Sequence, residues 1–91
     1  MTKEMKIDND LILLDQEDWD NLKNKITRLN IDKGGVKIFF KNEYKYLSKF
    51  YPCRLHRYIL NVHNDGLNKR VYHINNNKLD NRKSNLQLVE Y

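Results

Sequence analysis

Residues 70–91 read RVYHINNNKLDNRKSNLQLVEY and contain two short β-like stretches, 70–74 and 86–91. Between them runs a polar loop from Asn75 to Asn85 that is rich in asparagine. Asparagine side chains can satisfy the backbone groups of their own loop. The last third of the chain therefore predicts two short strands that flank a long polar loop.

Upstream, the sequence predicts a strand followed by a helix. Residues 6–10 look like a polar lead-in, and the apolar run 11–14 fits a buried strand. Asp15 is suited to begin a helix, because its carboxylate can accept from the first-turn N–H groups. We interpret Trp19 as a core residue on that helix rather than as a stacking platform. The apolar face of the helix would consist of Trp19, Leu22 and Ile26.

The middle of the chain predicts a second β-hairpin and a second helix. Strands are expected over 36–40 and 44–50, joined by a polar turn at 41–43. Alternating Lys and Tyr in the second strand are typical of a half-solvated sheet, although such residues can also line a nucleic-acid surface. Pro52 suits the first turn of a helix of about three turns. Its apolar positions would be Leu55, Tyr58, Ile59 and Val62, and Asn64-Asp65-Gly66 would end it.

Length and composition indicate one small α+β domain over residues 1–91. A chain of 91 residues with 40% hydrophobic content can bury one modest core. No Pro/Ser-rich linker or internal repeat divides it, and no apolar run approaches the roughly 20 residues that span a bilayer. The single Cys53 excludes an internal disulfide and a cysteine zinc site. Without a signal-peptide pattern, we expect a reducing, cytoplasmic location in a bacterial host.

Charge is divided unevenly along the chain. The first twenty residues hold seven acids and two lysines, and the other seventy-one hold fifteen Lys/Arg and five acids. The two parts therefore carry −5 and about +10. Concentrated positive charge attracts polyanions, which makes nucleic acid the natural partner. The alternative is a solvated basic surface without a ligand.

Residues 71–89 resemble the signature of the HNH-type (ββα-metal) endonuclease family of phage and homing enzymes. In that signature an Asp-His pair precedes an Asx/Gly-rich loop, then L-x-N-x-x-x-N-L and a strand, and residues 79–86 (LDNRKSNL) keep the spacing. Residues 55–60 (LHRYIL) resemble the helix before the motif, and residues 11–19 resemble the family's N-terminal strand and acidic helix. The resemblance spans nearly the whole chain, with its core motif at 55–91. It implies an HNH-like C-terminal hairpin with a long Asn-rich loop.

The resemblance also implies roles for individual residues. Hydrolysis of a phosphodiester needs a base that activates water and a divalent cation that neutralises developing charge. By position, His73 is the base candidate if the protein is active, and Asn81 and Asn85 are loop-structuring. Without the resemblance, His73 would be interpreted as an ordinary packed or surface histidine.

Two metal-binding elements of the family are absent from the motif. The residue before His73 is Tyr72, whose neutral phenol lacks the charge of the family's aspartate. The sequence ends at Tyr91, about where the family's metal-binding helix would begin, so the expected fold lacks that helix. Nothing in the spacing of Asp80 and Glu90 aims them at His73. We therefore predict no metal site and no cofactor, with Mg²⁺ or Mn²⁺ required only by an active nuclease.

Basic residues near the motif are the candidates for phosphate contacts, which would give a salt-dependent affinity. The alternative is that the loop cations are merely solvated and that Arg57 packs its stem on the helix. The six candidates are Arg54, Arg57, Arg70, Lys78, Arg82 and Lys83.

Three functions fit these patterns. The first is a catalytically silent, HNH-like protein of a phage or mobile element that binds DNA or a nucleoprotein complex. The second is a degenerate nuclease fold that acts as a protein-binding inhibitor of a host defence nuclease, such as a CRISPR or restriction nuclease. The third is an active metal-dependent HNH endonuclease. The patterns leave enzymatic activity, the oligomeric state and the identity of any protein partner open.

Overall fold

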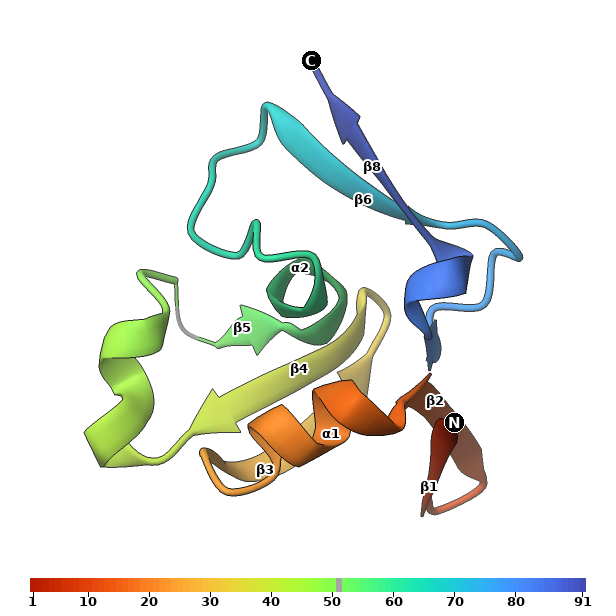
Figure 1. Ribbon diagram of the computed structural model, residues 1–91, viewed down its shortest axis with the longest axis vertical. Coiled ribbons are helices and arrows are strands. Elements are labelled where there is room, and N and C mark those ends of the chain that lie inside the picture. The colour runs from red at the N-terminus through yellow and green to blue at the C-terminus, as the bar shows by residue number, and fades with distance from the viewer. Residues whose placement is uncertain (51) are drawn as a thin grey trace.

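The computed structural model describes residues 1–50 and 52–91 and has the expected α+β architecture (Figure 1). Short strands form three small sheets, with strand orders β1-β2-β7, β3-β4-β5 and β6-β8. In chain order the elements are β1 (Thr2–Ile7), β2 (Asp10–Asp15), α1 (Gln16–Leu22), β3 (Ile26–Asp32), β4 (Gly35–Phe40), the 3₁₀ helix η1 (Asn42–Leu47), β5 (Cys53–Arg54), α2 (Leu55–Ile59), β6 (Lys69–His73), β7 (Asp80–Asn81), the 3₁₀ helix η2 (Lys83–Asn85) and β8 (Leu86–Glu90).

The N-terminal segment forms an antiparallel hairpin, so the expected polar lead-in at 6–10 is wrong. β1 pairs with β2 from Thr2 opposite Asp15 to Ile7 opposite Asp10. Asp8 takes a positive φ of 54° in the connecting turn, a conformation that Asp adopts more readily than most residues. The predicted strand at 11–14 is confirmed within β2, where alternate residues are buried.

Helix α1 begins after Asp15 as predicted but ends at Leu22, so the predicted helical position of Ile26 is wrong. Ile26 instead begins β3 and reaches the same core from a strand. Asp15 does not cap the helix with its side chain, because its Oδ2 accepts the backbone N–H of Lys83 at 3.2 Å. Trp19 packs against the core, in agreement with its interpretation.

The predicted strand over 36–40 is confirmed as β4, but the predicted hairpin over 36–50 is wrong, because β4 pairs with the strand before it. At the β3–β4 turn Gly35 has a φ of 111°, a backbone conformation that favours glycine. In the same turn Asp32 Oδ1 accepts the N–H of Gly34 at 2.8 Å. Residues 42–47 form η1 instead of a strand. β5 adds to the other edge of β4 and leads directly into α2.

Helix α2 is shorter than the predicted three turns and ends at Ile59. The chain turns at Asn61, which has a φ of 58°, although Val62 is still buried. The turn is held by Arg57, whose guanidinium donates to the carbonyls of Val62, Asp65, Gly66 and Lys69. The predicted helix end at Asn64-Asp65-Gly66 therefore lies inside this turn.

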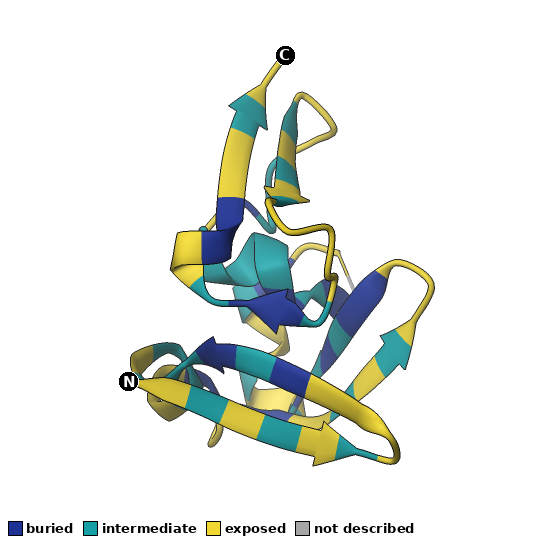
Figure 2. Ribbon diagram, turned by 90° about the vertical axis from the view of Figure 1, so that its right-hand side faces the viewer, coloured by how far each residue is buried: buried dark blue, intermediate teal, exposed yellow. Residues whose placement is uncertain are grey.

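The core lies between α1, α2 and the first two sheets, and the C-terminal hairpin projects from it (Figure 2). β6 and β8 pair antiparallel, which confirms the strands predicted over 70–74 and 86–91. β7 pairs parallel with β2 and ties the long loop to the N-terminal sheet. None of the helices in the described residues is long and apolar enough to cross a membrane. The buried apolar residues of the core are Ile12, Leu14, Leu22, Ile26, Val36, Ile38, Phe40, Cys53 and Leu55.

Candidate functional site around His73

The long loop is held by Asn85, which is 7% exposed. Its Oδ1 accepts the backbone N–H of Asn75 at 3.0 Å. Its Nδ2 donates to Asn75 Oδ1 and to the backbone carbonyl of Asp80, both at 2.9 Å. Asn85 thus bonds to the loop's own groups, and it fixes the ends of the loop between β6 and β8.

His73 is oriented by Asn81, the other loop asparagine of the motif. Its Nε2 lies 3.0 Å from Oδ1 of Asn81, a fully buried residue whose Nδ2 donates to the carbonyl of Lys78. Because an amide oxygen can only accept, the proton of neutral His73 resides on Nε2 and Nδ1 keeps its lone pair. The sequence motif thus brings a histidine and an asparagine together in a defined tautomeric arrangement.

A second histidine lies beside His73. The rings of His56 and His73 meet edge to face, with their centroids 5.1 Å apart. His56 Nδ1 is buried and has no hydrogen-bond partner among the described residues. Burial lowers the pKa of His56 to about 4, and its electrostatic interactions with His73, Arg54, Arg57 and Lys78 act in the same direction. Sequence reasoning did not single out His56, although it belongs to the quoted LHRYIL stretch.

The carboxylate of Asp80, close to His73 in the loop, is engaged with a cation. Asp80 is 1% exposed and accepts from Arg82 through Nε at 2.8 Å and Nη2 at 2.7 Å. The hydrogen bonds from Arg82 hold the pKa of Asp80 below its usual range. The hydroxyl of Tyr72 contacts that of Tyr91 at 2.5 Å. In the described part of the chain, no three His, Cys, Asp or Glu side chains converge as a metal site would require.

A search of protein families, curated proteins and solved structures found no match to this chain. The HNH resemblance therefore rests on the sequence blocks alone.

Three of the predicted phosphate-contacting residues lie around His56, and all three have partners within the chain. Arg54 forms a bidentate pair with Asp32, at 2.6 and 3.2 Å, and Arg57 is bonded to backbone carbonyls. Lys78 Nζ donates to the carbonyl of Lys33 at 2.7 Å. Their positive charges therefore remain at the site, while many of their N–H donors are engaged in hydrogen bonds within the chain.

The other three candidates are two loop cations and Arg70, which lines a second cavity together with His56. Arg82 is paired with Asp80, and Lys83 is paired with Asp18 at 3.2 Å. These two loop cations therefore face acidic residues rather than His73. Arg70 lies on β6 with its guanidinium 5.8 Å from the ring centre of Tyr91.

A cavity of about 210 Å³ opens beside the two histidines. Its remaining lining residues are Gly34, Val71, Tyr72, Asn76 and Lys78. The only formally charged group among these described lining residues is the ammonium of Lys78, and the guanidinium groups of Arg54 and Arg57 lie close enough to act on His56. The cavity is therefore electropositive.

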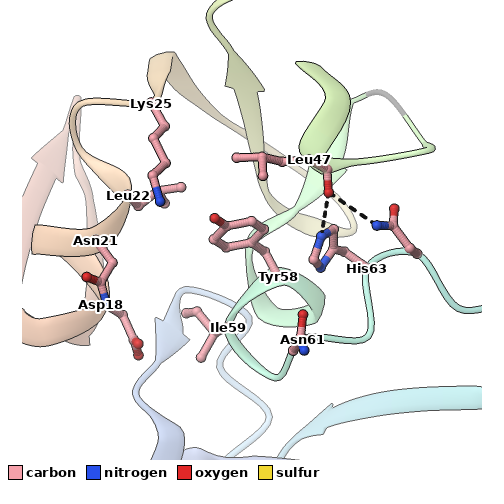
Figure 3. Close-up of a pocket in the computed structure, with 10 residues that line it drawn as sticks. Asp18, Asn21, Leu22, Lys25, Leu47, Tyr58, Ile59, Asn61 and His63 are labelled. Atoms are coloured by element: carbon pink, nitrogen blue, oxygen red, sulfur yellow. Dashed lines mark hydrogen bonds between the residues drawn. The ribbon is translucent and has the colours of Figure 1, made fainter. Parts of the chain in front are cut away.

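A larger cavity, of about 480 Å³, lies away from His73 between α1, η1 and α2 (Figure 3). Tyr58 lies in the middle of the residues that line this cavity (Figure 3). The Nε2 atom of His63 lies 2.8 Å from the carbonyl oxygen of Leu47. Asp18 and Lys25 give it one charge of each sign. Burial raises the pKa of Asp18 against the opposing effect of Lys83. The charges that line this larger cavity thus favour neither an anion nor a cation, whereas the cavity at His73 is electropositive.

Proposed function

We propose that this protein is a catalytically silent, HNH-nuclease-like domain of a phage or mobile element that binds DNA or a nucleoprotein complex in the cytoplasm of a bacterial host. The observation that supports this most is the electropositive cavity at His56 and His73. Lys78 lines this cavity, and Lys78, Arg54 and Arg57 lie close enough to His56 to help hold it neutral.

The nearby acid does not cancel this charge. Asp32 accepts from both Arg54 and Lys37, at 2.6 and 3.1 Å, so one carboxylate is shared by two cations. These hydrogen bonds, that of Arg54 foremost, hold the pKa of Asp32 well below its usual range. The group as a whole keeps a net positive charge, which attracts phosphate oxygens and raises the association rate of a polyanion.

Among the residues that the structure describes, the same site lacks the free carboxylate that a nuclease metal ion needs. Hard divalent cations prefer carboxylate and other oxygen ligands, and the position before His73 holds the phenol of Tyr72. Asp80 is buried and bonded to Arg82 through two nitrogens, so recruiting it would break a buried ion pair. Both observations favour binding without cleavage.

The competing candidate, an active endonuclease, is favoured by the bond between His73 and Asn81. This bond leaves Nδ1 of His73 as a proton acceptor, which is the state that a general base requires. Incubation of supercoiled plasmid with Mg²⁺ or Mn²⁺ separates the two candidates. We expect no nicking, and nicking that His73→Ala abolishes would establish the enzyme instead.

Binding is tested with a fluorescently labelled duplex, followed by anisotropy between about 50 and 200 mM salt. We expect the affinity to fall steeply with salt. Lys78→Gln should weaken binding and reduce the slope of log K against log salt by about one. Lys6→Gln on β1 is the matched control, with an unchanged slope. Salt-independent binding, or equal effects of the two variants, would contradict the proposal.

A further inference from the structure

The cavity at His73 continues as a groove along β6. Two more cavities, of about 210 and 410 Å³, follow it towards the start of the strand. Neighbouring cavities share lining residues: His56, Val71 and Tyr72 line the first and second, and Leu67 and Arg70 line the second and third. We call this continuous surface the β6 groove.

The β6 groove runs where the sheet has an open edge. Within the described residues β6 pairs with β8 alone (Figure 1). The middle cavity of the groove is lined by residues of β6, of α2 and of the turn that follows α2. Five residues of strand at about 3.3 Å each give the groove a length of roughly 17 Å. An extended chain of a few units fits this length.

The charge of the groove has one sign. The described residues that line its three cavities include Arg57, Arg70 and Lys78 but no Asp or Glu. The acids nearest to the start of β6, Asp65 and Glu90, lie 3.1 and 3.9 Å from the ammonium of Lys69. The groove therefore suits a polyanion along its whole length.

Two exposed tyrosines lie at the same surface. Tyr72 is 45% exposed and Tyr91 is 71% exposed, and their hydroxyls are in contact. Arg70 lies above the ring of Tyr91. Exposed aromatic rings beside a guanidinium provide stacking surfaces and a phosphate contact, the combination with which proteins hold unpaired bases.

We propose that the β6 groove binds single-stranded nucleic acid. The phosphates lie against Arg70 and Lys78, and unpaired bases stack on Tyr72 and Tyr91. This inference rests on the proposed function, since both require a nucleic-acid ligand, and it adds that the ligand is a single strand. A duplex keeps its base faces stacked on one another, so it cannot use the tyrosines in this way.

The test compares an oligothymidylate with a duplex of equal length by fluorescence anisotropy. We expect the single strand to bind about ten-fold more tightly or better. Tyr72→Ala and Tyr91→Ala should each weaken single-strand binding by roughly five- to a hundred-fold, whereas the Phe variants keep the ring and should retain most of the affinity. Tyr46→Ala on η1, where the residue is 78% exposed, is the matched control and should have no effect. Far-ultraviolet circular dichroism checks that each variant is folded.

A polyglutamate peptide is the second probe, because it carries negative charge and an extended backbone without bases. It should fail to displace the oligonucleotide at equal concentrations of charge. Displacement at equal efficiency would overturn the inference in favour of an acidic peptide that adds to the edge of β6. Duplex binding that equals single-strand binding and is insensitive to both tyrosines would also overturn it, while the proposed function would survive. Failure to bind either nucleic acid would remove both.

Discussion

The Nε2 atom of His73 on β6 lies 3.0 Å from Oδ1 of Asn81 on β7, and Asn81 is fully buried. Through this bond and its bond to the carbonyl of Lys78, Asn81 connects the projecting hairpin to the strand that pairs with β2. A buried polar group that loses its partner costs free energy comparable to its desolvation. Asn81 is therefore a structural link as well as the residue that orients His73.

Asn81→Ala should consequently destabilise the protein by about 1–3 kcal/mol, since His73 and the Lys78 carbonyl both lose a partner. Urea denaturation followed by circular dichroism measures this change. Asn24→Ala, at an exposed position after α1, is the control and should stay within about 0.5 kcal/mol of wild type. A similar small change for both variants would show that the bond does not contribute to stability.

Stability should fall as the pH falls from about 6.5 to about 4. The folded-state pKa of His56 is lowered to about 4, below the unfolded value, so the unfolded chain binds the additional proton over this range. The contribution is fully present above the unfolded pKa and is lost as the pH approaches the folded one, with a limit of about 3 kcal/mol. The groups that act on His56 are His73, Arg54, Arg57 and Lys78.

His56→Phe tests this pH dependence, because it keeps an aromatic ring beside His73 and removes the titrating group. The free energy of unfolding, measured in urea between pH 7 and 4.5, should depend less on pH in the variant. Identical slopes for wild type and variant would show that His56 does not titrate on unfolding.

The C-terminal hairpin could be predicted closely because its signals are local. β-like stretches on either side of an asparagine loop predicted both strands, and Asn75 and Asn85 bond to each other within that loop. In contrast, the alternation of Lys and Tyr over 44–47 predicted a strand, but these residues form part of η1. Helix α2 ends where the side chain of Arg57 bonds to carbonyls of the following turn, and no spacing of apolar residues signals such side-chain bonds.

The candidate site was predictable only in part for the same reason. His73, Asn81 and Asn85 follow from the motif, whereas the contact of His56 with His73 depends on how α2 packs against β6. The ion pairs that engage Arg54 and Lys83 join residues far apart in sequence. A list of basic residues near the motif therefore could not distinguish those around His56 from those that face acids.

Gly35 is the position where a methyl group should disturb both the fold and the site. Its φ is 111°, and a Cβ would lie 3.4 Å from the carbonyl oxygen of Lys78. Gly35→Ala should destabilise the protein by about 1–3 kcal/mol, because an L-residue is strained in this conformation. It should also weaken duplex binding, since Lys78 lines the electropositive cavity.

Gly66→Ala is the matched control for Gly35→Ala. Its added Cβ would meet only Asn68 Oδ1 at 3.5 Å among the contacts found, and its φ is not in the left-handed region. Thermal unfolding should show a clear loss of stability for the first variant and little change for the second. Equal effects would mean that neither the strain nor the contact with Lys78 decides the outcome.

Arg57 should matter to the fold more than to phosphate binding, contrary to its selection as a phosphate-contacting residue. Its guanidinium donates to four backbone carbonyls between Val62 and Lys69, at 2.7 to 3.3 Å. Lysine keeps the charge but cannot present several donors in this planar arrangement. Arg57→Lys should therefore destabilise the protein by about 2 kcal/mol, as expected for lost charge-assisted bonds to backbone carbonyls.

Arg28→Lys provides the comparison, because Arg28 is exposed on β3 and its guanidinium lies 4.3 Å from the ring centre of Phe39. It should cost no more than about 1 kcal/mol. The two variants are compared by urea denaturation and by their affinity for duplex DNA in buffer without urea. If Arg57→Lys unfolds at the same urea concentration as wild type but binds the duplex more weakly, Arg57 acts on the ligand and not on the turn. We expect the reverse, because the carbonyl bonds leave its guanidinium committed to the chain.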